Sequence, residues 1–221
     1  MPATVDRSQD ALSGAAVVLI HGFWLNPAWM ALLGRRLARR GLAPWHLRYA
    51  TMRRDLDTAA AGLARCVQAL RRRGAGPVHL VGHSLGGLVA LRGLARGVDL
   101  GGGRVVLLGC PVRGSGLARH FRAHGLGWVM GAMAGPLVAG LGPWRGPAEV
   151  GVVAGTMDFG VGRLLGGYHP PGDGTVAVAE TRLEGAADAV ERRATHLGLL
   201  FSRRVAEAVA AFLATGRFPE A

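Results

Sequence analysis

Short apolar runs that end abruptly at a turn residue recur along the first half of the chain. Ala15 to Ile20 is one such run, followed by His21-Gly22, and Val78 to Val81 is another, followed by Gly82. A short apolar run bounded by a turn residue is typical of a strand that is buried on both faces. We therefore predict that these two segments are central strands of a parallel sheet.

Two segments between these runs show the spacing of helices. From about Asn26 to Arg40, apolar and arginine positions alternate at helical intervals, and the pattern stops at Gly41, a residue type common just after helices. Asp55 to Arg73 is predicted to be a longer amphipathic helix, closed by Gly74. The segment between the two helices, Pro44 to Tyr49, is predicted to be a strand.

The alternation of strand and helix continues toward the C-terminal end. The predicted elements are a helix over Ser84–Arg96, strands over Arg104–Leu108 and Val150–Ala154, a last strand near Asp188–Arg192 and a closing helix over Leu199–Leu213. Such alternation indicates a mainly parallel sheet with helices on both faces, a three-layer α/β sandwich. At 221 residues the chain is expected to form a single domain, residues 1–221, with a flexible N-terminus over residues 1–14 and no large cap domain.

One uncharged stretch does not fit this alternation. Residues 125–144 form twenty consecutive positions without a charge and contain Gly127, Gly131, Gly135 and Pro136. Their number would suit a transmembrane helix, but a single crossing would place two strands of one sheet on opposite sides of a membrane. We expect instead a lid-like insert over residues 115–148. It is either a mobile lid or interfacial helix, or a buried helix pair packed through its glycines.

Composition excludes several classes of function. The chain contains 26 arginines and no lysine, so it holds neither a Walker A loop nor a pyridoxal Schiff base, which both need lysine. The formal net charge of +12 favours contact with an anionic membrane surface. The arginines are scattered over helix-like stretches, as on a solvated helix face, so no nucleic-acid partner is expected.

The cysteines and the first residues bear on location and cofactors. Cys66 and Cys110 are too few for a disulfide framework, match no metal-ligand spacing and are predicted to be buried free thiols. The first fifteen residues lack a basic segment followed by an apolar one, so no secretory signal is predicted. We expect a cytoplasmic protein, with peripheral contact to membranes as an option, and neither a metal nor an organic cofactor.

A candidate nucleophile lies where the second apolar run meets a helix. Gly82-His83-Ser84-Leu85-Gly86 matches the pattern G-x-S-x-G. The pattern alone is weak in a glycine-rich chain, but here it lies between a predicted buried strand and a predicted helix, the context that a nucleophile elbow requires. Glycines two positions on either side avoid clashes between strand and helix at this strained turn. Ser84 is therefore the predicted nucleophile.

Two backbone N–H groups are candidates for an oxyanion hole. The N-terminus of the helix after Ser84 presents its free N–H groups, that of Leu85 first. Hydrolases with this alternation place a second donor after the first strand, where the chain reads His21-Gly22-Phe23. We therefore expect the N–H groups of Phe23 and Leu85 to be the donors, and His21 and His83 to be structural histidines.

A general base and an orienting carboxylate should follow the nucleophile in the chain. His196, just before the closing helix, is the favoured base, and His169, which precedes two prolines, is its competitor. Asp173 and Asp158 both lie in loops beyond the strand at Val150. Asp173 is favoured because flanking glycines allow a tight loop and 23 residues remain before His196, enough for a last strand.

Four segments together resemble a known family. They are Ile20-His21-Gly22-Phe23, Val81-Gly82-His83-Ser84-Leu85-Gly86-Gly87, Asp173-Gly174-Thr175-Val176 and Thr195-His196-Leu197-Gly198-Leu199. With them, the chain resembles bacterial α/β-hydrolase lipases and esterases, particularly the PGAP1-like group of lipid-ester hydrolases. The resemblance runs from Val17 to about Phe218 and adds support for Asp173. Cys110-Pro111-Val112-Arg113-Gly114-Ser115 departs from it, because similar proteins often carry a threonine and a histidine in the related segment.

The resemblance implies a serine hydrolase that cleaves carboxylic ester bonds of lipid-like or apolar acyl substrates. Ser84, Asp173 and His196 would form its triad, an acyl-enzyme its intermediate, and a small acyl ester its partner. The apolar insert favours long acyl chains. A thioesterase or an acyltransferase would use the same three residues, and a catalytically silent binding protein would share the fold.

Overall fold

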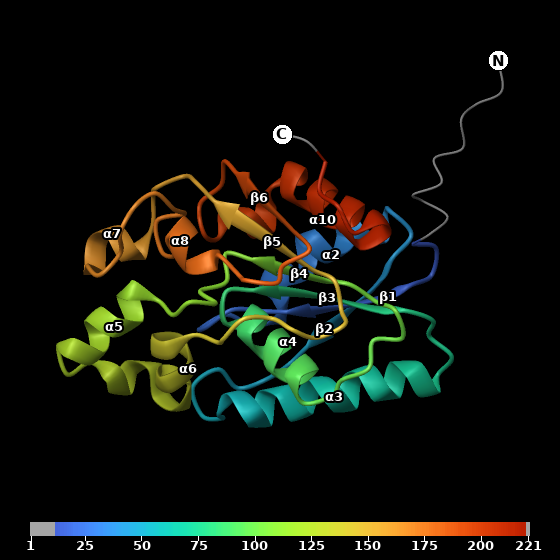
Figure 1. The fold of residues 1–221 in the computed structure, drawn as a ribbon, viewed down its shortest axis with the longest axis horizontal. Helices are drawn as coiled ribbons and strands as arrows, with labels where there is room; N and C mark the ends of the chain where they lie inside the picture. Colours follow the sequence, from blue (N-terminus) through green and yellow to red (C-terminus); the bar gives the residue numbers. More distant parts are fainter. Residues whose placement is uncertain (1–11, 220–221) are drawn as a thin grey trace, which may run out of the picture.

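Six parallel strands form the centre of the structure, a computed structural model that describes residues 12–219 (Figure 1). They are β1 (Ala16–Ile20), β2 (Ala43–Leu47), β3 (Val78–His83), β4 (Val105–Leu108), β5 (Val150–Gly155) and β6 (Asp188–Arg192). Their order in the sheet is β2-β1-β3-β4-β5-β6, and every neighbouring pair is parallel. The predicted three-layer α/β fold is therefore confirmed. The predicted flexible N-terminus lies outside the described residues except for residues 12–14.

The central strands are apolar throughout because each of them is buried on both faces. Along β1, Val18 and Ile20 belong to one hydrophobic core, and Val17 and Leu19 belong to the other. Successive side chains of a strand point to opposite faces of the sheet, so two cores require an uninterrupted apolar run.

Helices cover both faces of the sheet. On one face lie α3 (Leu56–Arg72) and α4 (Leu85–Ala95), and on the other lie η1 (Pro27–Met30), α2 (Ala31–Ala38), α9 (Gly198–Phe201) and α10 (Arg203–Thr215). Figure 1 shows α3 and α4 below the sheet and α2 and α10 above it. Shorter helices surround one end of the sheet: α5 (Gly116–Ala123), η2 (Gly127–Met133), α6 (Ala134–Ala139), α7 (Val161–Leu165) and α8 (Val178–Thr181).

Two helices that the sequence predicts as continuous are divided in the structure. The first begins as η1, whose N-cap Asn26 accepts a hydrogen bond of 2.9 Å from the N–H of Ala28, and it continues as α2, whose N-cap Met30 makes no side-chain hydrogen bond. Ser202 is extended and accepts from the N–H of Val205 at 3.3 Å, which ends α9 and starts α10. Such side-chain acceptors satisfy the free N–H groups of a helix start.

The insert between β4 and β5 consists of three short helices, α5, η2 and α6. Gly131 and Gly140 have positive φ angles of 54° and 71°, and they end the regular helical geometry on either side of α6. Met130, Met133 and Leu137 of the insert are buried in the core on the α3 and α4 side of the sheet. No helix within residues 12–219 is long and apolar enough to cross a membrane.

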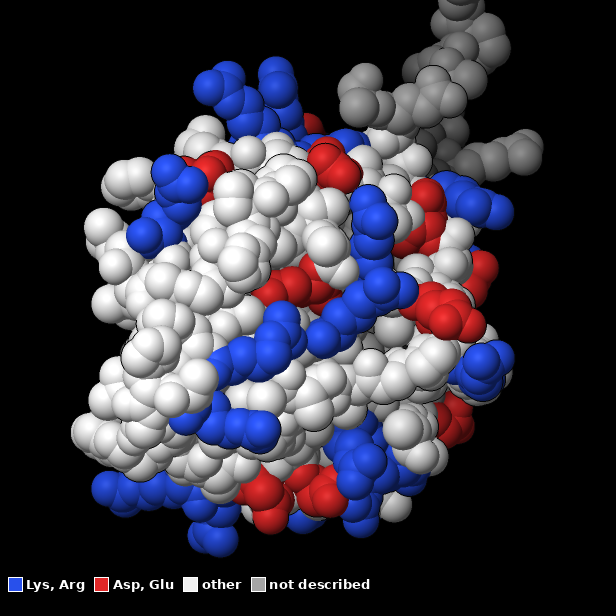
Figure 2. All heavy atoms as spheres, turned by 60° about the vertical axis from the view of Figure 1, so that its left-hand side comes forward, with Lys and Arg blue, Asp and Glu red and all other residues white. Residues whose placement is uncertain are grey.

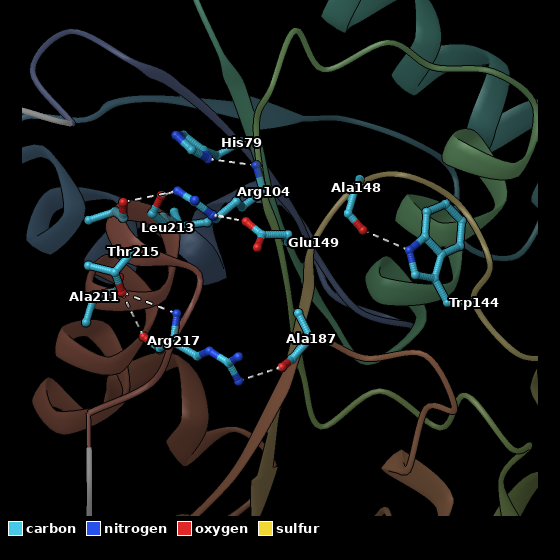
Figure 3. A network of polar contacts seen from close by, with 11 residues as sticks. His79, Arg104, Trp144, Ala148, Glu149, Ala187, Ala211, Leu213, Thr215 and Arg217 are labelled. Carbon is cyan, nitrogen blue, oxygen red and sulfur yellow. Dashed lines mark hydrogen bonds and ion pairs between the residues drawn. The ribbon is translucent and has the colours of Figure 1, made fainter.

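A polar network fastens the amino ends of the strands (Figure 3). The Arg104 side chain donates to Glu149 at 2.6 Å and to the carbonyl oxygens of Leu213 and Ala214 at 2.9 and 3.1 Å. Its backbone N–H donates to Nδ1 of His79 at 3.0 Å. The network joins β3, β4, β5 and α10 at the end of the sheet opposite the candidate active site.

Candidate active site

Ser84 lies in the turn between β3 and α4 with a strained backbone. Its φ and ψ angles are 53° and −122°, and Trp24 is the other non-glycine residue of the described chain with positive φ. Such a conformation costs about 1–3 kcal/mol and is kept only where the surroundings enforce it. A Cβ on Gly82 would lie 2.6 Å from the carbonyl oxygen of Gly86, and one on Gly86 would overlap the carbonyl oxygen of Ile20. The chain therefore approaches itself here as closely as glycine allows.

The loop after β1 lies directly against the serine. A Cβ on Gly22 would come within 2.9 Å of Nδ1 of His83 and 3.1 Å of Cβ of Ser84. The backbone N–H groups of Phe23 and Leu85 flank this contact, and neither donates to an acceptor within residues 12–219. The two N–H groups that are expected to stabilise an oxyanion are therefore not bound to other acceptors of the described chain.

Asp173 and His196 form a short hydrogen bond. Nδ1 of His196 lies 2.7 Å from Oδ2 of Asp173, whose side chain is fully buried. The other carboxylate oxygen of Asp173 accepts hydrogen bonds from the N–H groups of Thr175 and Val176 at 3.0 and 2.7 Å. The backbone N–H of His196 also donates to the carbonyl oxygen of Asp173 at 3.0 Å. Because the Nδ1–H donates to the carboxylate, Nε2 of the neutral ring is an acceptor.

The two competing candidates form no hydrogen bond to this pair among the described residues. Asp158, although in the same connection after β5, forms an ion pair with Arg163 at 3.3 Å. His169 is exposed, and its side chain makes no hydrogen bond to another described residue.

Ser84 and His196 line the same cavity, which has a volume of about 370 Å³ and mostly apolar walls. Ser84 also lines a smaller cavity of about 90 Å³ that extends beneath the insert. A cavity of about 540 Å³ lies near Arg104 and Trp144, but no candidate site residue borders it. We take the first two as the relevant ones because both reach the serine.

His83 connects the serine turn to the loop of His196, a contact that the sequence does not reveal. Its Nε2–H donates to the carbonyl oxygen of His196 at 3.0 Å, and the two rings lie 4.6 Å apart. Burial is the main reason why the pKa of His83 lies well below its usual range, and the nearby His196 lowers it further. The ring is therefore neutral. His21 is a second buried histidine with a structural contact. Its Nδ1–H donates to the carbonyl oxygen of Gly22, and its ring stacks on that of Tyr49. Burial lowers its pKa.

Glu180 is a second residue whose role the sequence does not indicate. This buried carboxylate accepts from the N–H of Gly116 at the start of the insert and from that of Ala177, and it lies 3.4 Å from Arg119. Burial raises its pKa. Glu180 thus fixes the insert to the loop that carries Asp173, through a contact over 64 positions that no local pattern encodes.

A family model described as "Alpha/beta hydrolase family" matches residues 17–217. The chain belongs to this family. The match covers α/β hydrolases as a whole and does not distinguish the PGAP1-like group. No curated protein sequence matches the chain.

Solved structures of other α/β hydrolases are similar in fold. The mature lipase BlEst2 of Bacillus licheniformis has a TM-score of 0.73 and 18% identity, over 85% of this chain and 87% of that one. The metagenomic carboxyl esterase MGS0156 has a TM-score of 0.69 and 19% identity, over 83% and 65% of the two chains. The esterase EaEST of Exiguobacterium antarcticum has a TM-score of 0.59 and 17% identity, over 91% of this chain and 92% of that one. At such identities the likeness establishes the fold of this hydrolase.

Proposed function

We propose that this α/β hydrolase is a serine esterase that cleaves carboxylic ester bonds of apolar, lipid-like substrates. The observation that carries the proposal is that Ser84, in its strained turn, shares one cavity with His196, which is hydrogen-bonded to the buried Asp173. A nucleophile, a base and a group that orients the base are the parts needed for acyl transfer. Solved structures of similar fold include proteins named as a lipase and as esterases.

The proposed reaction has two steps. Nε2 of His196 takes the proton of the Ser84 hydroxyl while its oxygen attacks the ester carbonyl, and the N–H groups of Phe23 and Leu85 stabilise the oxyanion. His196 then gives this proton to the departing alcohol, and the acyl group stays on Ser84. A water molecule then gives a proton to His196 and attacks the acyl-enzyme, and His196 returns this proton to the Ser84 oxygen as the carboxylic acid leaves. Asp173 keeps the ring in one orientation throughout.

Apolar substrates are favoured by the lining of the larger cavity. Side chains of Phe23, Leu25, Val161 and Leu197 form much of its wall. An apolar cleft with a few convergent polar groups is typical of a site for apolar ligands.

The rim of the site supports peripheral contact with an anionic lipid surface. Phe159, Leu164 and Trp128 are 78%, 86% and 74% exposed, and Arg163 precedes Leu164 in α7. Figure 2 shows this end of the molecule, with a broad uncharged surface beside a band of arginine side chains. Apolar side chains flanked by arginines, on a chain of net charge +12, suit anionic phospholipid headgroups.

Labelling with a fluorophosphonate probe tests the nucleophile. Wild type should be labelled and should hydrolyse p-nitrophenyl esters, while Ser84→Ala and His196→Ala should lose both properties. The exposed residues Ser13 and His169 provide matched controls, Ser13→Ala and His169→Ala, which should behave as wild type. Absence of labelling in well-folded wild type would contradict the proposal and favour a catalytically silent binding protein.

The same assay separates hydrolase from acyltransferase and thioesterase. With a short alcohol added as acceptor, an esterase should release mainly the free acid, whereas an acyltransferase should form mainly a new ester. A thioesterase should prefer a thioester over the ester of the same acyl group. A predominance of ester product, or of thioester cleavage, would overturn the assignment as a carboxylic ester hydrolase while retaining the proposed nucleophile.

A further inference from the structure

Two cavities of different size meet at the candidate nucleophile. The smaller and the larger share five lining residues: Phe23, Trp24, Ser84, Leu117 and Thr175. From this common wall the smaller cavity runs under the insert, and the larger runs toward α7 and the loop that carries His196. The serine therefore lies at a junction from which two parts of one substrate can extend.

Only the larger cavity is lined by His196. In acyl transfer to a serine, the histidine that accepts the serine proton donates it to the oxygen of the leaving alcohol. This oxygen must lie beside the imidazole, so the alcohol part of an ester extends on the histidine side. The acyl substituent is attached to the same carbonyl carbon and has to extend in another direction.

We propose that the larger cavity receives the alcohol part of the ester and the smaller cavity receives its acyl part. This assignment rests on the proposed esterase function and names its substrate class: esters of short carboxylic acids with large apolar alcohols. It differs from the preference for long acyl chains that the apolar insert favours at the level of sequence.

The volumes of the two cavities indicate which part of the ester can be long. Binding sites for small organic molecules usually measure about 300–1,000 Å³. The larger cavity, at about 370 Å³, lies in this range, and the smaller one, at about 90 Å³, lies well below it. A long alkyl chain therefore finds more enclosed space on the alcohol side than on the acyl side.

The small cavity is held small by packed side chains. Met130 and Leu137 of the insert and Ala118 of α5 line it, and all three are buried in the core on the α3 and α4 side of the sheet. Packed side chains yield little because the surrounding structure relaxes only partly when space is changed. The apolar residues of the insert thus fill the space that a long acyl chain would need.

A pair of isomeric esters tests the orientation directly. Hexyl acetate and methyl heptanoate have the same atoms and similar hydrophobicity, and differ in which side of the ester bond carries the long chain. Wild type should hydrolyse hexyl acetate with a kcat/KM at least about ten-fold higher, because even one misplaced methylene in an apolar pocket costs about ten-fold or more. Equal rates, or a preference for methyl heptanoate, would overturn the assignment.

Two methionines of η2 provide a matched pair of variants. Met130 and Met133 are both buried, but only Met130 lines the small cavity. Met130→Ala should raise the ratio of methyl heptanoate to hexyl acetate turnover several-fold, while Met133→Ala should lose comparable stability and leave this ratio unchanged. The same change of ratio in both variants would contradict a specific role of the small cavity.

The larger cavity is tested from its exposed wall. Val161 lines it and is half exposed, so Val161→Trp should fold and narrow the alcohol side. The variant should lower the ratio of hexyl acetate to methyl acetate turnover, since both esters carry the same acyl group. An unchanged ratio would overturn the alcohol assignment.

Failure of the inference and failure of the proposed function are distinguishable. If both long-chain isomers are hydrolysed equally and Ser84→Ala abolishes both reactions, the cavity assignment is wrong and the esterase function holds. If neither isomer is hydrolysed and the fluorophosphonate probe does not label wild type, the esterase function is itself wrong, and the assignment falls with it.

Discussion

The centre of the site and the insert are both rich in glycine, but only in the elbow is every glycine position closely surrounded. In the elbow, residues 82–87, a Cβ on Gly82, Gly86 or Gly87 would collide with neighbouring backbone or with Cys110. In the insert, Gly135 has no neighbouring atom within 4 Å of such a Cβ. A Cβ on Gly131 or Gly140 would collide with the backbone of Met52 or Gly114, so the insert contains both crowded and open glycine positions, whereas all three glycines of the elbow are crowded.

The centre of the site and its rim also differ in burial. In the centre, which consists of the elbow with Asp173 and His196, the elbow and Asp173 are buried and His196 is half-buried and hydrogen-bonded to Asp173. The rim, which consists of the insert and residues 157–165, carries several exposed apolar side chains. We expect substitutions in the centre to have much larger effects than those in the rim.

The largest effect on turnover is expected from replacing Asp173, and the competing carboxylate Asp158 provides the matched control. Asp173→Asn should lower kcat by about 10⁴-fold, because an amide in place of the carboxylate favours the wrong tautomer of the histidine. Asp158→Asn should leave kcat within about two-fold of wild type, since Asp158 pairs with Arg163 and not with His196. Turnover of a p-nitrophenyl ester measures both. Equal losses in the two variants would erase the distinction between centre and rim.

A second effect concerns stability and compares two glycines. Gly86→Ala should destabilise the fold by about 3 kcal/mol or more, because the added methyl overlaps the Ile20 carbonyl. Gly135→Ala should change stability by less than about 1 kcal/mol, since it adds a methyl in open space within a helix. Urea unfolding gives both values, and a stable Gly86→Ala protein would show that the elbow is less tightly packed than described.

A third effect is the pH dependence of stability that His83 introduces. Its folded pKa is depressed below the ordinary value of 6.5, so the unfolded state binds more protons as the pH falls below about 6.5, and stability declines. For one such histidine the loss between pH 7 and pH 5 is at most about 2 kcal/mol. His83→Gln keeps an N–H donor but does not titrate, and should reduce the decline.

Urea unfolding at the two pH values measures this effect. His21 and His79, whose pKa values are also lowered mainly by burial, should leave part of the decline in place. The exposed His169 supplies the control, because His169→Gln should decline as wild type does. An equally steep decline in His83→Gln would show that His83 does not contribute.

The smallest effect belongs to the rim. Leu164→Ser should leave turnover of a soluble ester unchanged, because Leu164 lines neither cavity at the serine. The same variant should bind several-fold more weakly to vesicles that contain anionic phospholipid, because it removes an exposed apolar side chain. Trp45→Ser, at a half-exposed apolar position in β2, should not weaken it. Vesicle sedimentation at low and high salt measures binding. Equal binding of wild type and Leu164→Ser would show that α7 does not contact the lipid.

The sequence predicts those parts of the molecule that repeat a physical regularity. Burial on both faces makes the central strands uniformly apolar, and the elbow needs small residues around Ser84, so both leave local patterns. The proximity of Asp173 and His196 is also expected from their order in the chain. In the structure the two side chains are joined by a hydrogen bond of 2.7 Å.

Contacts between distant segments leave no such pattern. The bond from His83 to the carbonyl of His196 spans 113 positions, and the one from Glu180 to the N–H of Gly116 spans 64. Single capping residues such as Ser202 divide a helix whose apolar periodicity is continuous. The volume on each side of Ser84 depends on how the insert packs, which periodicity does not encode.

The polar network around Arg104 has a consequence for how this protein can evolve. It fastens the amino ends of the strands, at the opposite end of the sheet from the serine (Figure 3). The helices of the insert and α7 take no part in the hydrogen bonds of Arg104. On the proposed function, changes in the loops at the serine end can therefore alter which ester is bound while the contacts of Arg104 stay in place.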